Sequence, residues 1–320
     1  MKQMTLAAAR GFEVHGRATR KAEFLARMDA LVPWAQLCAV IEPHYPKAGN
    51  GRPPVGLERM LRIHFLQHWF NLSDPAVEEA LYESASMRHF VGIDLGREPV
   101  PDETTILKFR HLLERHELGA RVFEQVGAHL QAQGFRLSTG TIVDATLIAA
   151  PSSTKNAGQS RDPEMHQSKK GKQWYFGMKA HVGVDAKSKL IHRVVATSGN
   201  VHDSKVLSSL LHGKESAVWG DSAYAGQSEV IERAAPWAQD LTQRRGKGYK
   251  YLSQMQRSIN RSRSKVRARV EHAIGTIKRI FNFTKVRYRG LAKNGNRLFV
   301  AAALANLYMV RRQLLALPRP

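Results

Sequence analysis

The sequence of 320 residues predicts an α/β protein in which an all-helical N-terminal region, residues 1–135, precedes an α/β region, residues 136–320. Three observations predict this order. Apolar residues recur at every fourth position in the first region, a β-branched run begins near residue 141, and a helical period returns near residue 253. We therefore expect two differently built parts, with helices first and an α/β domain second.

In the first region, the helix starts support the apolar period. Asp74 and Asp102 each stand where a helix N-cap is expected, and Pro75 follows Asp74 at the first helical position. The apolar stripe of the preceding helix is formed by Leu57, Leu61, Phe65 and Trp69.

On the same expected helix, His64 and His68 are four residues apart, a spacing that can hold zinc. Further ligands are not evident near them in the sequence. We therefore expect a polar flank of a packed helix rather than a metal site.

The second region begins with strand-like runs. These are residues 141–149, 178–186, 190–198 and 217–226, the last ending in a turn. A short polar turn joins the second run to the third. The polar and basic stretch at residues 151–173 is too long for an ordinary connection and is expected to be a functional or disordered loop.

Helical patterns follow the strands. A helix is expected to start near Asp203, where capping is the plain explanation for that residue. Residues 253–281 are expected to be helical, with one buried stripe formed by Val266, Val270, Ile274, Ile277 and Phe281.

The charge is distributed unevenly. The net charge is +22; residues 1–135 contain 16 basic and 16 acidic residues, and residues 136–320 contain 33 basic and 11 acidic residues. A surplus of this size in one region favours a polyanionic partner, most simply nucleic acid, over a merely basic protein.

The cysteine content and the length of the apolar runs indicate the cellular location of the protein. The single Cys38 fits a reducing compartment, and the apolar runs are shorter than a signal peptide or a membrane span requires. We expect a soluble, intracellular protein without a membrane partner.

Three acidic residues stand where a structural role is hard to find. Asp144 lies inside an apolar strand, Asp221 ends a short strand, and Glu271 is the only acidic residue in 241–320, among 20 Lys and Arg. Each alone has a plain explanation: a backbone turn, a strand end, or an ion pair with Arg267. Together they favour carboxylates that hold Mg²⁺ or Mn²⁺, because hard cations prefer oxygen ligands and make a carboxylate site attractive to phosphate.

This arrangement of a strand Asp, a strand-end Asp and a helix Glu resembles the DDE triad of ribonuclease H-like transposases. The segments "TIVDATLIAAPSSTKN", "TSGNVHDSK", "VWGDSAYAG" and "RARVEHAIGTIKRIF" are similar to those of bacterial insertion-sequence transposases of the insertion sequence 5 family, within the insertion sequence 4 superfamily. The resemblance covers about residues 50–310. It implies a ribonuclease H-like catalytic domain, a mixed sheet flanked by helices, with basic C-terminal helices.

The superfamily's helix signature runs Tyr, two residues, Arg, three residues, Glu, six residues, Lys. Arg267, Glu271 and Lys278 occupy its last three positions, and Ser264 departs from the signature at the Tyr position. The acids are 77 and 50 residues apart, so no large domain is inserted before the catalytic helix.

The resemblance implies roles for individual residues. Asp144, Asp221 and Glu271 are the expected catalytic residues and ligands of two Mg²⁺ or Mn²⁺ ions. Arg267 and Lys278 are expected to contact phosphates near the scissile bond. Further DNA-binding residues are expected to be Lys169, Lys170, Lys172, Arg287, Arg289 and Trp219. Trp219 is expected either to stack on an unpaired base or to pack in the core.

The resemblance also implies the reaction. A DDE-type transposase performs metal-dependent phosphoryl transfer on DNA: it hydrolyses phosphodiester bonds at inverted-repeat ends and joins the freed 3′-hydroxyl groups to target DNA. Residues 1–135 would recognise the ends and assemble a homodimer or larger complex. The chain would be cytoplasmic and bacterial, and at the nucleoid when it acts.

Two alternatives remain open at this point. A structure-specific ribonuclease H-like nuclease would cut DNA without joining strands. A non-catalytic nucleic-acid-binding protein, either a repressor or a decayed copy, would bind without metal and would not cut.

Overall fold

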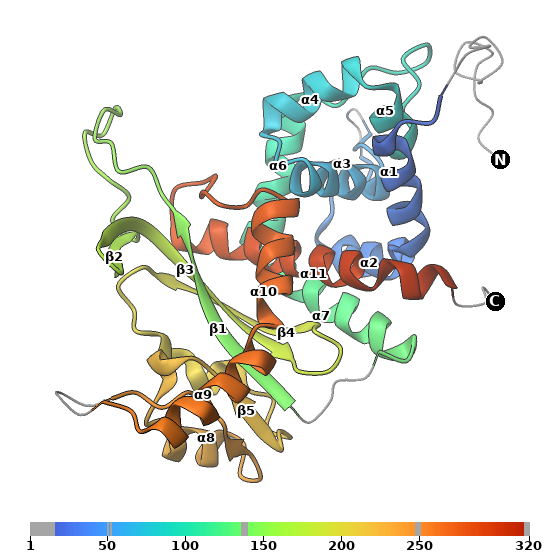
Figure 1. Ribbon diagram of the computed structural model, residues 1–320. Helices are drawn as coiled ribbons and strands as arrows, with labels where there is room; N and C mark the ends of the chain where they lie inside the picture. Colours follow the sequence, from blue (N-terminus) through green and yellow to red (C-terminus); the bar gives the residue numbers. More distant parts are fainter. Residues whose placement is uncertain (1–16, 50, 52, 136–139, 247–250, 317–320) are drawn as a thin grey trace. The chain divides into compact units, whose positions relative to one another are not determined.

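The computed structural model describes residues 17–49, 51, 53–135, 140–246 and 251–316 (Figure 1). The chain forms two compact units, one comprising Met1–Gln125 and Val310–Pro320 and the other comprising Val126–Met309. The first boundary lies within helix α7 (Leu118–Ala132). The expected functional division into residues 1–135 and 136–320 stays a prediction.

The described residues of the first unit form helices. They are α1 (Arg20–Leu31), α2 (Trp34–Ile41), the 3₁₀ helix η2 (Glu42–His44), α3 (Leu57–Trp69), α4 (Asp74–Glu83), α5 (Ala85–Val91), α6 (Glu103–Arg115) and the start of α7 (Leu118–Ala132). The apolar stripe predicted on α3 is confirmed for Leu61, Phe65 and Trp69, which are all buried.

Two helix N-caps were predicted for this unit, and the structure confirms one of them and not the other. Asp102 is the N-cap of α6, and its carboxylate accepts a hydrogen bond from Thr105 N at 2.6 Å. The prediction for Asp74 was wrong: Ser73 is the N-cap of α4, and Asp74 instead accepts hydrogen bonds from Arg110 at 2.9 Å and Gln67 at 2.8 Å. The Asp74 carboxylate is thus held by a guanidinium on another helix, a partner that the local sequence does not reveal.

His64 and His68 do not lie on a polar flank of α3. Both are buried, with their Nε2 atoms 3.2 Å apart. The pair is therefore part of the interior of the first unit.

A mixed sheet forms the centre of the second unit. Within the described residues it has six strands: β1 (Gly140–Ala149), β2 (His166–Lys170), β3 (Gln173–Asp185), β4 (Ile191–Ser198), β5 (Ala217–Trp219) and β6 (Gln239–Asp240). β3 runs antiparallel to β1 on one edge and to β4 and then β2 on the other. β5 is parallel to β1, and β6 is parallel to β5. A mixed sheet flanked by helices is consistent with the ribonuclease H-like fold that we expected.

One strand was not predicted. Residues 151–173 are not a single loop, because residues 166–170 form β2 and pair with the first residues of β3. β2 has the sequence HQSKK and offers no apolar alternation, so the pattern that identifies half-buried strands is absent from it.

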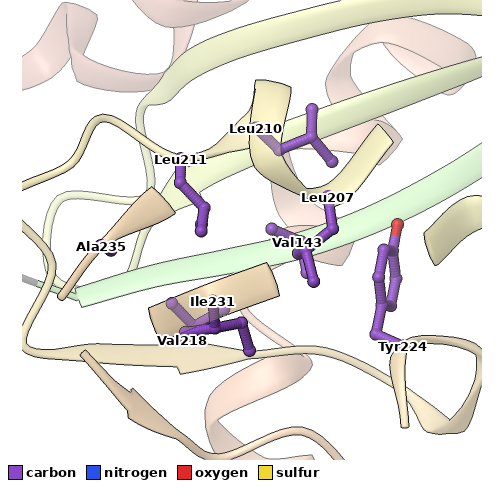
Figure 2. Packing of buried hydrophobic residues seen from close by; sticks show 8 residues of the cluster. All are labelled: Val143, Leu207, Leu210, Leu211, Val218, Tyr224, Ile231 and Ala235. Carbon is purple, nitrogen blue, oxygen red and sulfur yellow. The ribbon is translucent and has the colours of Figure 1, made fainter. Parts of the chain in front are cut away.

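The two faces of the sheet are covered differently. The 3₁₀ helix η3 (Asp203–Leu210) and α8 (Ser228–Ala234) contribute to an apolar cluster on the face that bears Val143 (Figure 2). The other members of this cluster are Leu207, Leu210, Leu211, Val218, Tyr224, Ile231 and Ala235. Successive side chains of a strand point to opposite faces, so Asp144 belongs to the other face.

The C-terminal helices contact β1 on the Asp144 face. They are α9 (Gln254–Arg267), α10 (Val270–Gly275) and a π-helical turn, η5 (Thr276–Ile280). The single helix predicted for residues 253–281 is therefore wrong: a turn at residues 268–269 interrupts it. Of the predicted stripe, Val270, Ile277 and Phe281 are buried, whereas Val266 and Ile274 are half-buried, because the break and the π turn shift the buried face.

The last helix, α11 (Leu291–Ala316), is long and apolar. By length and composition it could cross a membrane, and α1 with the segment Trp34–His44 passes the same test only as a bent pair. In α11, 61% of the apolar window is buried inside the protein, which is how a core helix behaves.

Candidate active site

Asp144 lies in the middle of β1 and is mostly buried. Its side chain is 15% exposed, one oxygen accepts a hydrogen bond from Ala145 N at 2.8 Å, and the other lies 3.0 Å from a guanidinium nitrogen of Arg267. Burial raises the pKa of Asp144 to about 6; the Ala145 amide and Arg267 act against this, and the charges of Asp221 and Asp203 add to it. The carboxylate is therefore held in a position where a further positive charge would stabilise it.

Asp221 lies next to the position of Asp144, just beyond the end of the neighbouring strand β5. Ile142 of β1 is paired in parallel with Trp219 of β5, so Asp144 and Asp221, each two residues further along, lie level with one another. Asp221 is the N-cap of the 3₁₀ turn η4 (Ser222–Tyr224), and its carboxylate accepts a hydrogen bond from Ala223 N at 2.9 Å. This turn fixes one oxygen of Asp221 just beyond the end of β5.

Glu271 is connected to one of the two aspartates, Asp144, through Arg267. Arg267 is the last residue of α9 and Glu271 lies in the first turn of α10; a nitrogen of Arg267 is 3.8 Å from a carboxylate oxygen of Glu271. Arg267 therefore links Asp144 to Glu271. The side chain of Glu271 is 61% exposed, so it stands at the open side of the site.

Lys278 lies against the same strand, two to three residues further along. Its ammonium donates to Thr146 Oγ1 at 3.1 Å and to the Leu147 carbonyl at 2.8 Å. Arg267 and Lys278, two of the three signature residues, thus both contact β1 beside Asp144. The π turn η5 carries Lys278, and such turns are frequent at functional sites.

Ser264, at the signature Tyr position, makes local contacts. Its hydroxyl donates to the Asn260 carbonyl at 2.9 Å and accepts from the Gln243 side chain. It therefore ties α9 to the segment after β6 rather than extending toward the acids.

A second group of polar residues lies near the aspartates, and for one of them, Asp203, the sequence predicted only a helix cap. Asp203 accepts a hydrogen bond from Lys179 at 2.9 Å, so it forms an ion pair, and His202 rather than Asp203 caps η3. Tyr224 is fully buried, and its hydroxyl oxygen points away from the apolar cluster (Figure 2). Burial, and then the charges of Asp203, Asp144 and Asp221, raise the pKa of Tyr224 well above its usual value. The signal that could have located this group is the polar run around "HDSK" before an apolar helix.

The residues expected to bind DNA are spread over several elements. Lys169 is exposed on β2, and Lys172 is exposed in the turn that follows; the Lys170 side chain lies outside the described residues. Arg287 is exposed, and Arg289 donates to Ser160 Oγ at 3.2 Å. Arg289 thus lies against the segment before β2, at Ser160.

Trp219 is half-buried and lies against the backbone of Gly140. A Cβ atom built at Gly140 would be 2.9 Å from the Trp219 ring. The ring therefore packs over the start of β1, four residues before Asp144. Stacking of Trp219 on a base stays a prediction, and core packing accounts for this contact.

Among the residues that the structure describes, no group of three or more His, Cys, Asp or Glu is arranged to hold a metal ion. In the structure, the positive charge next to Asp144 and Glu271 is that of Arg267.

Two family models match the chain. The family described as "Transposase DDE domain" matches residues 136–307, and the family described as "Transposase domain (DUF772)" matches residues 12–112. The first match covers more than half of the chain and includes Asp144, Asp221 and Glu271.

Proposed function

Because the chain belongs to the family of transposases with a DDE domain, and is therefore a DNA transposase, we propose that it cleaves DNA at the inverted-repeat ends of an insertion sequence. It then joins the freed 3′-hydroxyl groups to target DNA. We assign it to the insertion sequence 5 family, within the insertion sequence 4 superfamily. The Arg267, Glu271 and Lys278 spacing supports this assignment.

One observation carries the proposal. Asp144 and Asp221 lie level on adjacent parallel strands, and Arg267 links Asp144 to Glu271. Two of the three carboxylates, from β1 and α10, thus share one cation of the protein, and the third stands at the end of the strand beside β1. A purely structural ion pair accounts for Arg267 with one acid, but not for a second acid, Asp221, level with the first just beyond the end of the neighbouring strand.

DDE transposase domains generally use divalent metal ions, and the donor set fits them. Asp144 and Asp221 offer carboxylate oxygens, and the raised pKa of Asp144 reflects a buried negative charge that a hard cation would stabilise. We propose that Asp144, Asp221 and Glu271 hold two Mg²⁺ or Mn²⁺ ions. When bound, such ions activate water and stabilise charge on the attacking and leaving oxygens of the phosphate.

The chain's own residues then position the DNA. Lys278 is fixed by Thr146 and the Leu147 carbonyl, so its ammonium presents a point charge at a defined place beside Asp144. Arg267 carries a planar guanidinium that suits bidentate contact with a phosphate. We assign both to the phosphate at the scissile bond, and Lys169, Lys170, Lys172, Arg287 and Arg289 to phosphates further away.

The partners follow from the reaction. The DNA partners are the terminal inverted repeats and the target, and acting on two ends favours a homodimer or a larger assembly. The N-terminal helices, including those in the residues matched as a transposase domain, are assigned to end recognition and assembly. The neutral charge of residues 1–135 places most of the electrostatic affinity for DNA in residues 136–320.

The test uses purified full-length protein, Mg²⁺, and linear DNA that carries the element with its own ends. Glu271→Gln should abolish strand cleavage and retain DNA binding, because the amide keeps the size of the side chain and removes its charge. Glu232→Gln, at an exposed position on α8, is the matched control and should cleave as the wild type does. Cleavage by Glu271→Gln at the wild-type rate would show that the triad assignment is wrong.

A second substrate separates a transposase from a nuclease. DNA with pre-cleaved ends and free 3′-hydroxyl groups should yield joined product with a target plasmid. Cleavage of intact ends without any joining of pre-cleaved ends would favour the nuclease. Metal-independent binding without cleavage would favour a repressor or a decayed copy.

A further inference from the structure

The hairpin of β2 and β3 exposes an aromatic residue beside a lysine. Trp174 is 65% exposed, and the ammonium of Lys169, its partner across the hairpin, lies 5.6 Å from the centre of the indole ring. Gly171, with φ of +62°, and Lys172 form the two-residue turn between the strands. A single exposed apolar side chain is ordinary at a protein surface, so the exposure of Trp174 gains meaning only from the basic and aromatic residues beside it.

A second basic and aromatic pair continues the same face. Phe176 is two residues after Trp174, and the guanidinium of Arg161 lies 5.5 Å from the centre of its ring. Arg161 is fixed by its own hydrogen bond to the Ser152 carbonyl at 2.8 Å. We call Lys169, Trp174, Arg161 and Phe176 the hairpin face.

The hairpin face continues the side of the sheet that carries the candidate active site. Val182 of β3 is the register partner of Asp144. Directly paired residues of antiparallel strands point to the same face, and every second residue of a strand does so as well. Trp174 is eight residues before Val182, so both rings lie on the Asp144 side, no more than about 27 Å along β3 from the level of Asp144.

Nearby acidic residues do not cancel the positive charge of this face. Asp162 accepts a hydrogen bond from Gly290 N at 2.7 Å, and Glu164 accepts one from Leu291 N, where α11 begins. Carboxylates at a helix N-terminus are stabilised there by the helix dipole. Asp162 and Glu164 are therefore directed at the start of α11, where they hold the 150–165 segment in place.

We infer that the hairpin face binds a DNA strand next to the cleavage site and that Trp174 stacks on an unpaired base of that strand. This inference rests on the proposed function, because the DNA is the strand that the active site cuts. The positive charges are complementary to phosphates, and an aromatic residue among basic side chains on a β ribbon is the arrangement that binds single strands. An indole needs the open face of a base, which a paired and stacked duplex covers.

The test measures the affinity of full-length protein for two DNAs of the same sequence, without divalent metal. One is a fully paired duplex, and the other is forked, with single-stranded arms that contain 2-aminopurine. Trp174→Ala should weaken binding of the forked DNA by roughly 5- to 150-fold and should abolish the change in 2-aminopurine fluorescence. Its affinity for the duplex should stay within about twofold of the wild type.

Matched variants separate stacking from a general loss. Trp237 is 86% exposed, follows α8, and lies outside the hairpin face; Trp237→Ala should bind both DNAs as the wild type does. Trp174→Phe keeps an aromatic ring and should retain most of the preference for forked DNA. Lys169→Met should reduce the salt dependence of binding by about one unit of slope, because one phosphate contact is lost.

Three outcomes overturn the inference. If Trp174→Ala and Trp237→Ala bind forked DNA equally well, Trp174 does not stack, and the proposed function still stands when the wild type cleaves ends. If Trp174→Ala changes the sedimentation of a dimer to that of a monomer without changing DNA affinity, the face binds a second copy. If the wild type binds neither DNA, the inference and the proposed function both fail.

Discussion

Val143 and Asp144 are consecutive residues of β1, yet they belong to opposite environments. Val143 is fully buried among apolar side chains of η3, β5 and α8, whereas Asp144 faces Arg267 on the other side of the sheet. The Val143 face is a closed core, and the Asp144 face gathers charged side chains from distant parts of the chain. A shift of the pairing register of β1 by one residue would place Asp144 in the apolar core and Val143 on the charged face.

This difference separates stability from chemistry along a single strand. On the Val143 face, substitutions should change the free energy of unfolding and affect the reaction only through loss of folded protein. At Asp144 and the charged residues that gather beside it, substitutions should change the reaction with little effect on folding. Four predictions test that separation.

The largest expected effect is on the reaction. Asp144→Asn should lower the rate of strand cleavage by about 1,000-fold or more, because a neutral amide is a poor ligand for a divalent cation. The free energy of unfolding at pH 7.5 should not fall by more than about 1 kcal/mol, since removing the buried charge offsets the lost ion pair with Arg267. Gel assays of cleavage and urea denaturation measure the two quantities. Loss of folding in this variant would contradict the separation of the faces.

The next largest expected effect is on the free energy of unfolding, and it concerns Val143. Val143→Ala should lower the free energy of unfolding by about 2–3 kcal/mol, because it removes two buried methyl groups and leaves a cavity. At a temperature where the variant is folded, its cleavage rate should stay within about threefold of the wild type. Urea denaturation followed by circular dichroism checks the first part. A variant as stable as the wild type would mean that this face is not packed as described.

A smaller effect on the reaction is expected at Lys278. Lys278→Met should slow cleavage by about 10- to 100-fold, because the charge at the phosphate is lost while the stem of the side chain remains. Lys278→Arg keeps the charge but not the compact ammonium that Thr146 and Leu147 fix, so it should recover only part of the rate. Equal cleavage by all three proteins would assign Lys278 to packing alone.

The smallest expected effect is on the pH dependence of the free energy of unfolding, and it concerns His192 on the Val143 side of the sheet. His192 hydrogen bonds with Thr141 Oγ1 at 3.2 Å, and burial, followed by the charges of His212 and Arg193 and opposed by Asp185, lowers the pKa of His192 to about 3. The unfolded chain takes up this proton near pH 6.5 and the folded chain does not. The free energy of unfolding should therefore fall by about 1.4 kcal/mol for each pH unit below 6.5 on account of this residue.

His192→Gln removes that proton uptake in the unfolded state. Urea denaturation of both proteins at pH 7.5, 6.5 and 5.5 should give a shallower decline for the variant. Parallel declines in the two proteins would show that His192 does not stay neutral when the chain is folded.

Several elements were predictable because their signals are local. The alternation of β1, the runs that became β3 and β4, and the cap of α6 by Asp102 all depend on residues close in sequence. β2 was not predictable, because its polar residues pair with an exposed part of β3 and carry no apolar pattern. The break after Arg267 was also hidden, since the apolar period continues across it.

In the candidate site, too, the residue identities were predictable from the sequence and the contacts between distant residues were not. The identities of Asp144, Asp221, Glu271, Arg267 and Lys278 followed from a resemblance in residue spacing. The link from Arg267 to Asp144 joins residues 123 positions apart, and no local pattern indicates it. The sequence predicted a helix cap at Asp203. Its actual partner, Lys179, lies on another element, so no local pattern indicates that ion pair.

The sequence by itself determined which residue types were present for phosphoryl transfer and which half of the chain carries the positive charge. Only the tertiary structure decided which residues meet: it placed Asp144 level with Asp221, set Trp219 against Gly140, and left Trp174 exposed beside Lys169. The physical reason is that spacing along a strand or helix assigns a side chain to a face, whereas pairing between strands and packing of helices decide what that face meets.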